Sequence, residues 1–200
     1  MHWIILAVFL WGLVHSLLAT HKAKELAVKI FEARQARFYR LAYNVFAGVS
    51  FLLVLYVMFR VPDRLIYLVP VPWSLFMVGG ELLAVAALLS AFRQTDIWDF
   101  IGVRQLGENA QPSKLTTSGL YHYVRHPLYS AGVAFIWLLP LMTVNILVVN
   151  ISLTVYVVIG AIFEERKLRR TFGQEYIEYT LVTPMLVPFL KGNKNQCESS

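Results

Sequence analysis

The sequence has few charged residues and a single cysteine. Asp, Glu, Lys and Arg together make up 15% of its 200 residues, whereas a soluble domain has about 25%. Cys197 is the only cysteine, so an intramolecular disulfide and a zinc site built on cysteines are both excluded. Hydrophobic residues reach 58% of the chain. This composition is typical of a protein that lies largely in a lipid bilayer.

Motifs of common nucleotide-binding and zinc-dependent enzymes are also absent. The chain contains neither G-x-G-x-x-G nor G-x-x-x-x-G-K-[ST], and no H-E-x-x-H. His122 and His126 are four residues apart and would share one face of a helix. Pro127 is equally consistent with a helix end at this point. No metal site is predicted.

Long apolar segments predict an all-α, polytopic membrane protein. About 20 consecutive apolar residues are enough for one helix to cross a bilayer. The block from Tyr129 to Phe163 carries no charge and is longer than one crossing of about 30 Å needs. Pro140 and Asn145 can divide it into two short spans. About five transmembrane helices are therefore expected, over residues 3–20, 41–59, 73–92, 129–143 and 145–163.

Lys and Arg are concentrated in alternate connections between these spans. Segments 21–40, 93–128 and 164–200 hold six, four and six of the 18 Lys and Arg residues, and the connection after the second span holds Arg60 and Arg64. By the positive-inside rule, the three basic segments are predicted to be cytoplasmic. Topology and anionic lipid account for the net charge of +6, so no nucleic-acid partner is predicted.

The chain is predicted to form a single domain over residues 1–190, followed by a disordered tail over 191–200. The first apolar segment lacks a basic start and is expected to be an uncleaved span. A short amphipathic helix is expected over 172–179, before Pro184. Its Tyr176 and Tyr179 suit a membrane interface. The sequence gives no indication of an oligomeric state.

Polar residues on both sides of the uncharged block form the candidate site. If the block folds back as two spans, Arg125 and His126 on one side meet Glu164 and Glu165 on the other. Arg offers a rigid fork for a carboxylate or phosphate, and His can transfer a proton near neutral pH. The glutamates can bind an ammonium group or balance Arg125. The alternative is an anchor at the lipid headgroups, where isolated Arg and Tyr residues are common.

Two stretches carry a family resemblance: LTTSGLYHYVRHPLY (115–129) and EERKLRRTFGQEYIEY (164–179). They resemble the membrane-embedded methyltransferases typified by isoprenylcysteine carboxyl methyltransferase and, more loosely, the phospholipid N-methyltransferases. The resemblance covers about residues 96–188. WDFIGVRQL (98–106), LPLMT (139–143) and HSLLATHKAKE (15–25) are similar to bacterial NnrU-like proteins, and closer still to methanethiol S-methyltransferases.

The resemblance implies that S-adenosylmethionine (SAM) is the methyl donor and binds at the cytoplasmic ends of the last spans, in a bacterial inner membrane. Glu164 would hold the amino group of its methionine part. Arg125, His126 and Glu165 are candidate catalytic residues, with Arg125 and Glu165 as supports. The implied cofactor-binding set is Leu115, Thr116, Tyr121, His126, Pro127, Leu128, Tyr129 and Glu164.

The methyl acceptor is expected to be a small molecule or a lipid-soluble compound. Prenylcysteine methyltransferases carry an Arg one helical turn before the residue that matches Glu164, and this chain has Gly160 there. This departure favours a neutral acceptor such as a thiol. His15 and Arg104 are candidate acceptor-binding residues. Glu81, in the third span, suits helix packing and catalysis equally.

Other functions stay open on the sequence alone. One alternative is methylation of a carboxyl group, as in isoprenylcysteine carboxyl methyltransferases, and another is a phospholipid-type methyltransferase. A non-enzymatic NnrU-like protein with a role in transport or assembly would keep the spans without a complete cofactor pocket. A haem-binding bundle needs two facing histidines within the spans, and only His15 is well placed for that role.

Overall fold

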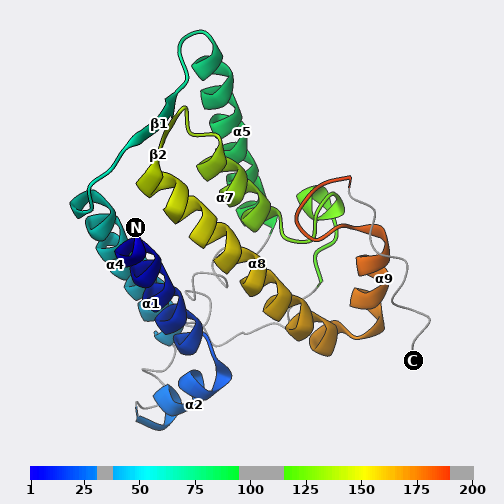
Figure 1. The fold of residues 1–200 in the computed structure, drawn as a ribbon. Coiled ribbons are helices and arrows are strands. Elements are labelled where there is room, and N and C mark those ends of the chain that lie inside the picture. Colours follow the sequence, from blue (N-terminus) through cyan, green and yellow to red (C-terminus); the bar gives the residue numbers. More distant parts are fainter. Residues whose placement is uncertain (31–37, 95–114, 190–200) are drawn as a thin grey trace. The chain divides into compact units, whose positions relative to one another are not determined.

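The computed structural model describes residues 1–30, 38–94 and 115–189, which are mostly helical (Figure 1). They divide into two compact units. Unit 1 contains the described residues of 1–68 together with 141–153, and unit 2 contains those of 69–95, 113–140 and 154–200. The single domain over 1–190 stays a prediction. The expected disordered tail lies outside the described residues.

Unit 1 combines three helices, a short two-stranded sheet and the beginning of a fourth helix. Its elements are α1 (His2–Leu18), α2 (His21–Ile30), α4 (Tyr39–Arg60), β1 (Leu65–Leu68), β2 (Leu141–Thr143) and the part of α8 (Val144–Phe172) up to Leu153.

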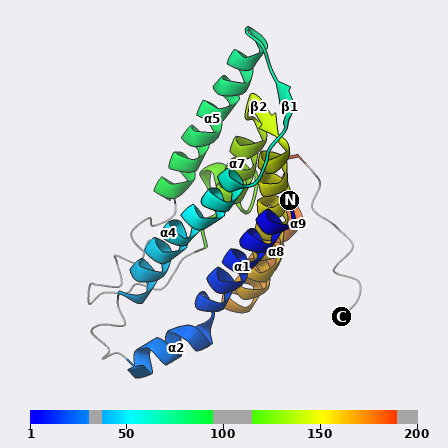
Figure 2. The same cartoon turned by 60° about the vertical axis from the view of Figure 1, so that its left-hand side comes forward.

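Helices α1 and α4 lie side by side in unit 1 (Figures 1 and 2). The Trp11 indole N–H donates a hydrogen bond of 3.0 Å to the carbonyl of Ala47, and the Tyr39 hydroxyl donates one of 2.7 Å to the carbonyl of Leu18. Each bond joins the two apolar helices and satisfies a polar group on an aromatic side chain. These contacts align α1 with α4 over several turns.

The residues where β2 meets α8 form hydrogen bonds with the C-terminal end of α4. The Asn145 amide is fully buried and donates hydrogen bonds to the carbonyls of Met58 (3.1 Å) and Val61 (2.9 Å). The Asp63 carboxylate accepts a bond of 3.0 Å from the backbone N–H of Asn145, in the first turn of α8. Carbonyls at a helix C-terminus and N–H groups at a helix N-terminus have no partner within their own helix. This junction supplies partners for both.

The described residues are mostly helical, as predicted, and they also contain one short sheet that was not predicted. β1 pairs antiparallel with β2, with Leu65 opposite Thr143 and Leu68 opposite Leu141. Pro140 cannot continue a helix, and the extended residues after it pair with the connection between α4 and α5. The break in the long uncharged block was therefore predicted correctly near Pro140, but the strand was not.

Unit 2 contains three helices, the rest of α8 and a short 3-10 helix. Its elements are α5 (Trp73–Gln94), the 3-10 helix η2 (Gly119–His122), α7 (Pro127–Trp137), α8 from Thr154 to Phe172, and α9 (Gln174–Val182). Gly173 separates α8 from α9 at a φ of 56°, a left-handed conformation that glycine adopts without strain. The C-terminal helix thus begins at Gln174 and extends to Val182, beyond the predicted end at Tyr179.

Helix α5 packs closely against α7 in unit 2. Ala84 and Ala91 of α5 and Ala131 of α7 are buried, and a Cβ atom added at Gly80 would lie 2.9 Å from the Leu138 side chain. Small residues permit close approach between helices in a membrane, where association depends on packing.

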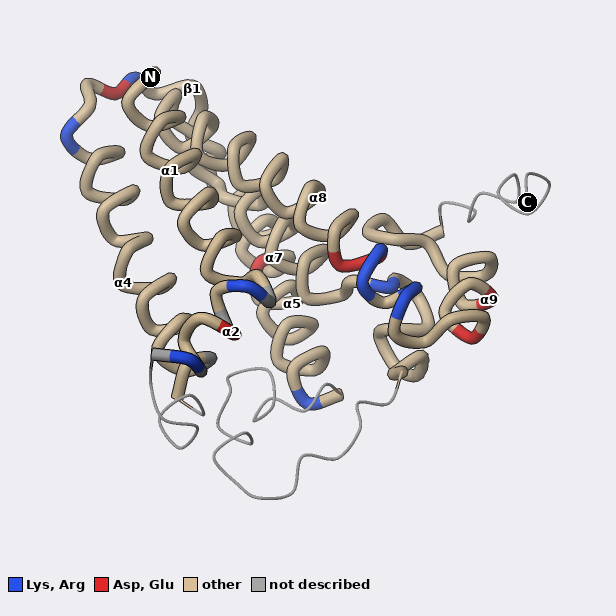
Figure 3. Tube along the Cα trace, turned by 90° about the horizontal axis from the view of Figure 1, so that it is seen from below, with Lys and Arg blue, Asp and Glu red and all other residues tan. Residues whose placement is uncertain are grey.

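Among the described residues, three helices are long and apolar enough to cross a membrane: Leu41–Arg60, Trp73–Gln94 and Val144–Phe172. They indicate an integral membrane protein. The predicted number of five spans is not confirmed, because α1 has 17 residues and α7 only 11, about 25 and 16 Å of helix. α8 also runs to Phe172, beyond the predicted end at 163. Figure 3 shows that charged residues gather near helix ends and in connections.

The Asn145 junction predicts a specific loss of stability. Asn145→Ala leaves the carbonyls of Met58 and Val61, at the end of α4, without this donor, and each such loss costs about 1 to 3 kcal/mol. We expect the free energy of unfolding in detergent to fall by about 2 kcal/mol or more. Ser50→Ala is the control, because Ser50 bonds only the carbonyl of Ala47 within the same helix. It should change the stability by less than about 0.5 kcal/mol. Equal effects of the two substitutions would contradict this role of Asn145.

Candidate functional site

The site begins where η2 meets the end of α5. Gly119 has a φ of 62°, and a Cβ atom there would collide with the Gln94 side chain. The Gln94 amide oxygen accepts a hydrogen bond of 2.9 Å from the backbone N–H of Leu120. Pro127 starts α7, a position that suits proline because the first N–H groups of a helix lack partners. Gly119 therefore permits η2 to pack against the end of α5, and Pro127 fixes where the segment that contains Arg125 and His126 ends and α7 begins.

Glu165 is the centre of a buried hydrogen-bond network. The Arg125 guanidinium donates two hydrogen bonds to the Glu165 carboxylate, from Nε at 2.7 Å and from Nη2 at 3.0 Å. The Tyr176 hydroxyl donates a third bond of 2.9 Å, and His126 Nε2 lies 3.1 Å from the same carboxylate. The Arg125 and Glu165 side chains are each only 9% exposed. A buried ion pair of this kind is stable only when further hydrogen bonds satisfy both charges.

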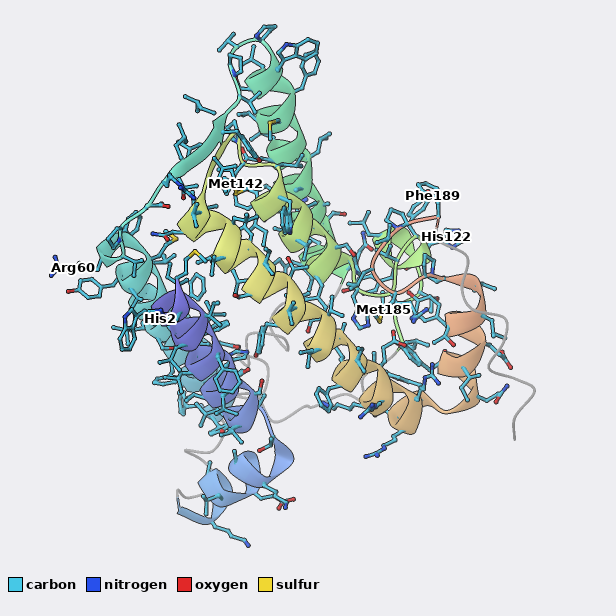
Figure 4. All side chains as sticks on the ribbon, in the orientation of Figure 1. His2, Arg60, His122, Met142, Met185 and Phe189 are labelled. Carbon is cyan, nitrogen blue, oxygen red and sulfur yellow. The ribbon has the colours of Figure 1, made fainter. Side chains whose placement is uncertain are left out.

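A segment after α9 runs alongside the residues that lead into α7. We call Thr183–Leu186 the C-terminal strap. The backbone N–H groups of Arg125 and His126 donate to the carbonyls of Pro184 (2.9 Å) and Met185 (3.1 Å). The Arg125 guanidinium also donates to the carbonyl of Thr183. Figure 4 labels Met185 of the strap and His122 on the neighbouring turn. One residue, Arg125, therefore binds both the strap and α8.

Tyr176 and Tyr179 of α9 face into unit 2. Both are buried, which corrects the expectation that they sit at the membrane interface. Burial raises the pKa of both phenols, and the Glu165 carboxylate raises the pKa of Tyr176 further. Both hydroxyls therefore keep their protons at neutral pH and act as donors. Tyr176 donates to Glu165, and Tyr179 donates to the carbonyl of Tyr121.

Glu164 has different surroundings from its neighbour. Its side chain is 41% exposed and accepts a hydrogen bond of 2.8 Å from the Tyr129 hydroxyl. His126 Nδ1 lies 3.6 Å from the same carboxylate oxygen, and the rings of His126 and Tyr129 stack at 5.4 Å. An oriented and accessible carboxylate beside aromatic rings can bind a cationic group.

The structure brings most of the predicted site residues together in unit 2. Arg125 and His126 contact Glu165, and His126 and Tyr129 contact Glu164, so the five residues form one connected cluster. Other members lie close in the chain: Leu115 and Thr116 precede η2, Tyr121 lies within it, and Pro127 and Leu128 begin α7. Their predicted roles in cofactor binding and catalysis stay predictions.

The two residues predicted to bind the acceptor, His15 and Arg104, are not among the contacts of this cluster that the structure describes. His15 belongs to unit 1, where its Nε2 is 2.5 Å from the Tyr43 hydroxyl and its ring stacks on Trp11. Arg104 lies outside the described residues.

Sequence analysis did not identify the contributions of Tyr176 and of the C-terminal strap. The spacing of Tyr176 and Tyr179 places both on one face of a helix, and this pattern could have indicated an inward face. The strap binds through backbone carbonyls, which every residue has. No pattern of side chains could have revealed it.

A family model described as phospholipid methyltransferase matches residues 75–175, about half of the chain. The matched region includes most of α5 and all of η2, α7 and α8, and with them Arg125, His126, Glu164 and Glu165. No solved structure matches the chain.

Several curated proteins are similar to the chain. A methanethiol S-methyltransferase of Crocosphaera subtropica is 33% identical over 123 residues, which cover 59% of this chain and 46% of the relative. Methanethiol S-methyltransferase 1 of Bradyrhizobium diazoefficiens is 32% identical over 165 residues, covering 75% and 54%. The human protein-S-isoprenylcysteine O-methyltransferase is 35% identical over 125 residues, covering 60% and 41%. The chain spans about half the length of these relatives.

The two adjacent glutamates should differ sharply in their effect on stability. Glu165→Ala leaves the Arg125 guanidinium buried without its anion, and we expect a loss of about 3 to 5 kcal/mol. Glu164→Ala, the matched control, removes a partly exposed carboxylate and should cost less than about 1 kcal/mol. Unfolding in detergent, followed by circular dichroism, measures both. If Glu164→Ala destabilised the protein as much as Glu165→Ala, Glu165 would not be the structural centre.

Proposed function

This chain belongs to the phospholipid methyltransferase family, and from this premise we propose that it is an integral membrane methyltransferase that transfers a methyl group from SAM to a small thiol such as methanethiol. The observation that carries the proposal is the pair of glutamates at the end of the apolar part of α8. Glu165 is bound by Arg125, whereas Glu164 is oriented by Tyr129 and still accessible. Such a carboxylate can form strong, charge-assisted hydrogen bonds with a cationic ligand.

The residues around Glu164 suit the charges of SAM. When bound, SAM supplies an electrophilic methyl group on a positively charged sulfonium. Glu164 can accept hydrogen bonds from the ammonium group of its methionine part, with Tyr129 fixing the carboxylate. The aromatic faces of Tyr121 and Tyr129 suit a sulfonium. We further propose that Leu115, Thr116 and the residues from His126 to Tyr129 complete the cofactor site.

Arg125 and Glu165 support the site without reacting, in our proposal. The guanidinium uses its Nε and Nη2 donors on Glu165, and Nη1 points to the carbonyls of Thr180 and Thr183. Because these donors of Arg125 are all in use, the side chain has a structural role: it keeps His126 and the start of α7 in position. His126 is the remaining catalytic candidate of the cluster, since its ring lies between the two glutamates.

A neutral thiol is the acceptor that this region favours. Gly160 lies one turn before Glu164 on α8, and a Cβ atom there would meet no other atom within 4 Å. The chain therefore provides no cation at this position for the carboxylate of a prenylcysteine. A thiol needs mainly positioning and desolvation. Several relatives are named methanethiol S-methyltransferases, which also supports this acceptor. The relatives described carry methyltransferase names, so a non-enzymatic NnrU-like role is not favoured.

The acceptor residues and the membrane location extend the same proposal. His15 and Arg104 are our candidates for binding the acceptor. We propose a bacterial inner membrane with the Glu164 end of α8 in the cytoplasm. The basic residues at that end and the bacterial relatives support this placement.

Cofactor binding by Glu164 variants tests the proposal. Calorimetry on the detergent-purified chain should show saturable SAM binding. Glu164→Ala should weaken it by more than about tenfold, because a hydrogen bond to a charged group is worth about 1.5 to 3 kcal/mol.

Glu178→Ala is the matched control, since Glu178 is an exposed glutamate of α9. Its affinity should equal that of the unmodified chain. Unchanged SAM affinity in folded Glu164→Ala would remove the ammonium-binding role, and no binding by the folded parent chain would refute the proposed function.

A further inference from the structure

The part of α8 that belongs to unit 2 exposes an apolar stripe. Val155, Ile159 and Phe163 follow one another at spacings of four residues and therefore share one face of the helix. All three are about half exposed or more, with Phe163 at 61%. An exposed apolar stripe on a membrane-spanning helix is suited to contact lipid acyl chains.

The same face becomes basic where the apolar residues end. Arg166 and Arg170 continue the spacing from Phe163 in steps of three and four, and Lys167 lies beside them. All three side chains are exposed, and the Arg166 guanidinium lies 5.4 Å from the centre of the Phe163 ring. Figure 3 shows the blue Lys and Arg segment at this end of α8.

The opposite face of the same turns is used inside unit 2. Glu165 is buried, and its charge is balanced by Arg125. Glu165 is therefore not available to balance the basic face, and Glu164 is a single, partly exposed carboxylate beside three basic residues. Positive charge remains at the exposed end of the apolar stripe, and its natural partner is an anion that also has an apolar part.

We propose that this face of α8 binds an anionic phospholipid. The acyl chains lie along Val155, Ile159 and Phe163, and the headgroup phosphate is held by Arg166, Lys167 and Arg170. Guanidinium groups bind phosphate through two parallel hydrogen bonds, and basic residues next to a membrane-spanning helix attract anionic lipids. The apolar stripe distinguishes a lipid from a soluble phosphate, which would use only the basic end.

A lipid bound to this face would lie next to the candidate functional site. The basic turns directly follow Glu164 and Glu165 in the chain. A headgroup on this face holds the last turns of α8 at the bilayer surface. The inference is independent of the methyl donor, because it rests on the exposed face of α8 and not on the cofactor site.

Lipid titration of the full chain in a neutral detergent tests this proposal. Phosphatidylglycerol is the anionic probe and phosphatidylcholine the neutral reference. Native mass spectrometry counts the lipids retained, and the thermal midpoint reports their effect on stability. The parent chain should retain phosphatidylglycerol in preference, and less of it as the salt concentration rises.

The decisive comparison uses two double variants. Arg166→Gln with Arg170→Gln should weaken phosphatidylglycerol binding by roughly 25-fold, or about fivefold per basic residue. Arg60→Gln with Arg64→Gln is the matched control. Arg60 resembles Arg166, because its guanidinium lies 5.8 Å from the centre of an aromatic ring, that of Tyr56. Arg64 lies beyond the end of α4, so these two arginines do not form a basic face on one helix. The control should bind as the parent chain does.

Three outcomes would overturn the proposal. The first is equal retention of the two lipids by the parent chain. The second is unchanged phosphatidylglycerol binding in the double variant of Arg166 and Arg170. This variant must first be shown, without lipid, to have the same thermal midpoint as the parent chain. The third is displacement of phosphatidylglycerol by inorganic phosphate at similar concentration, which would identify an anion site without a lipid component.

Discussion

The ion pair between Arg125 and Glu165 is the interaction on which unit 2 depends. It joins the start of α7, the end of α8 and the C-terminal strap, which are far apart in the sequence. Removing two charges from water is costly, and a buried pair holds only when its remaining donors and acceptors are satisfied. Tyr176 and His126 supply further hydrogen-bonding groups to Glu165. The network is therefore a structural connection made from polar groups.

This connection also separates the roles of two neighbouring glutamates. Consecutive residues of a helix point about 100° apart, so α8 turns Glu165 into unit 2 and leaves Glu164 partly exposed. One carboxylate fixes the fold while the other keeps the capacity to bind a cation. Tyr129 connects the two carboxylates. It lies on α7, directly after Arg125 and His126 in the chain, and its hydroxyl orients Glu164. A methyl donor with an ammonium and a sulfonium group fits this division.

Much of this arrangement could be predicted from the sequence, and the misses have physical causes. The uncharged block and its flanking polar residues placed Arg125, His126, Glu164 and Glu165 at one site, because helix length and charge limit how a chain crosses a bilayer. The strand pairing and the strap rest on backbone groups, which leave no signature in side-chain pattern. α7 ends after 11 residues, and the chain then becomes extended and pairs as β2 with β1, a change that hydropathy does not register.

Methyl transfer itself tests the central claim most directly. The full chain, reconstituted in lipid nanodiscs, would be incubated with methanethiol and SAM carrying a deuterated methyl group, and the headspace analysed by mass spectrometry. The account predicts trideuterated dimethyl sulfide, formed in equal amount with S-adenosylhomocysteine as the thiol sulfur gains the methyl group and loses its proton. Absence of labelled product from folded protein that binds SAM would contradict methanethiol as the acceptor. Absence of both product and SAM binding would contradict the methyltransferase assignment.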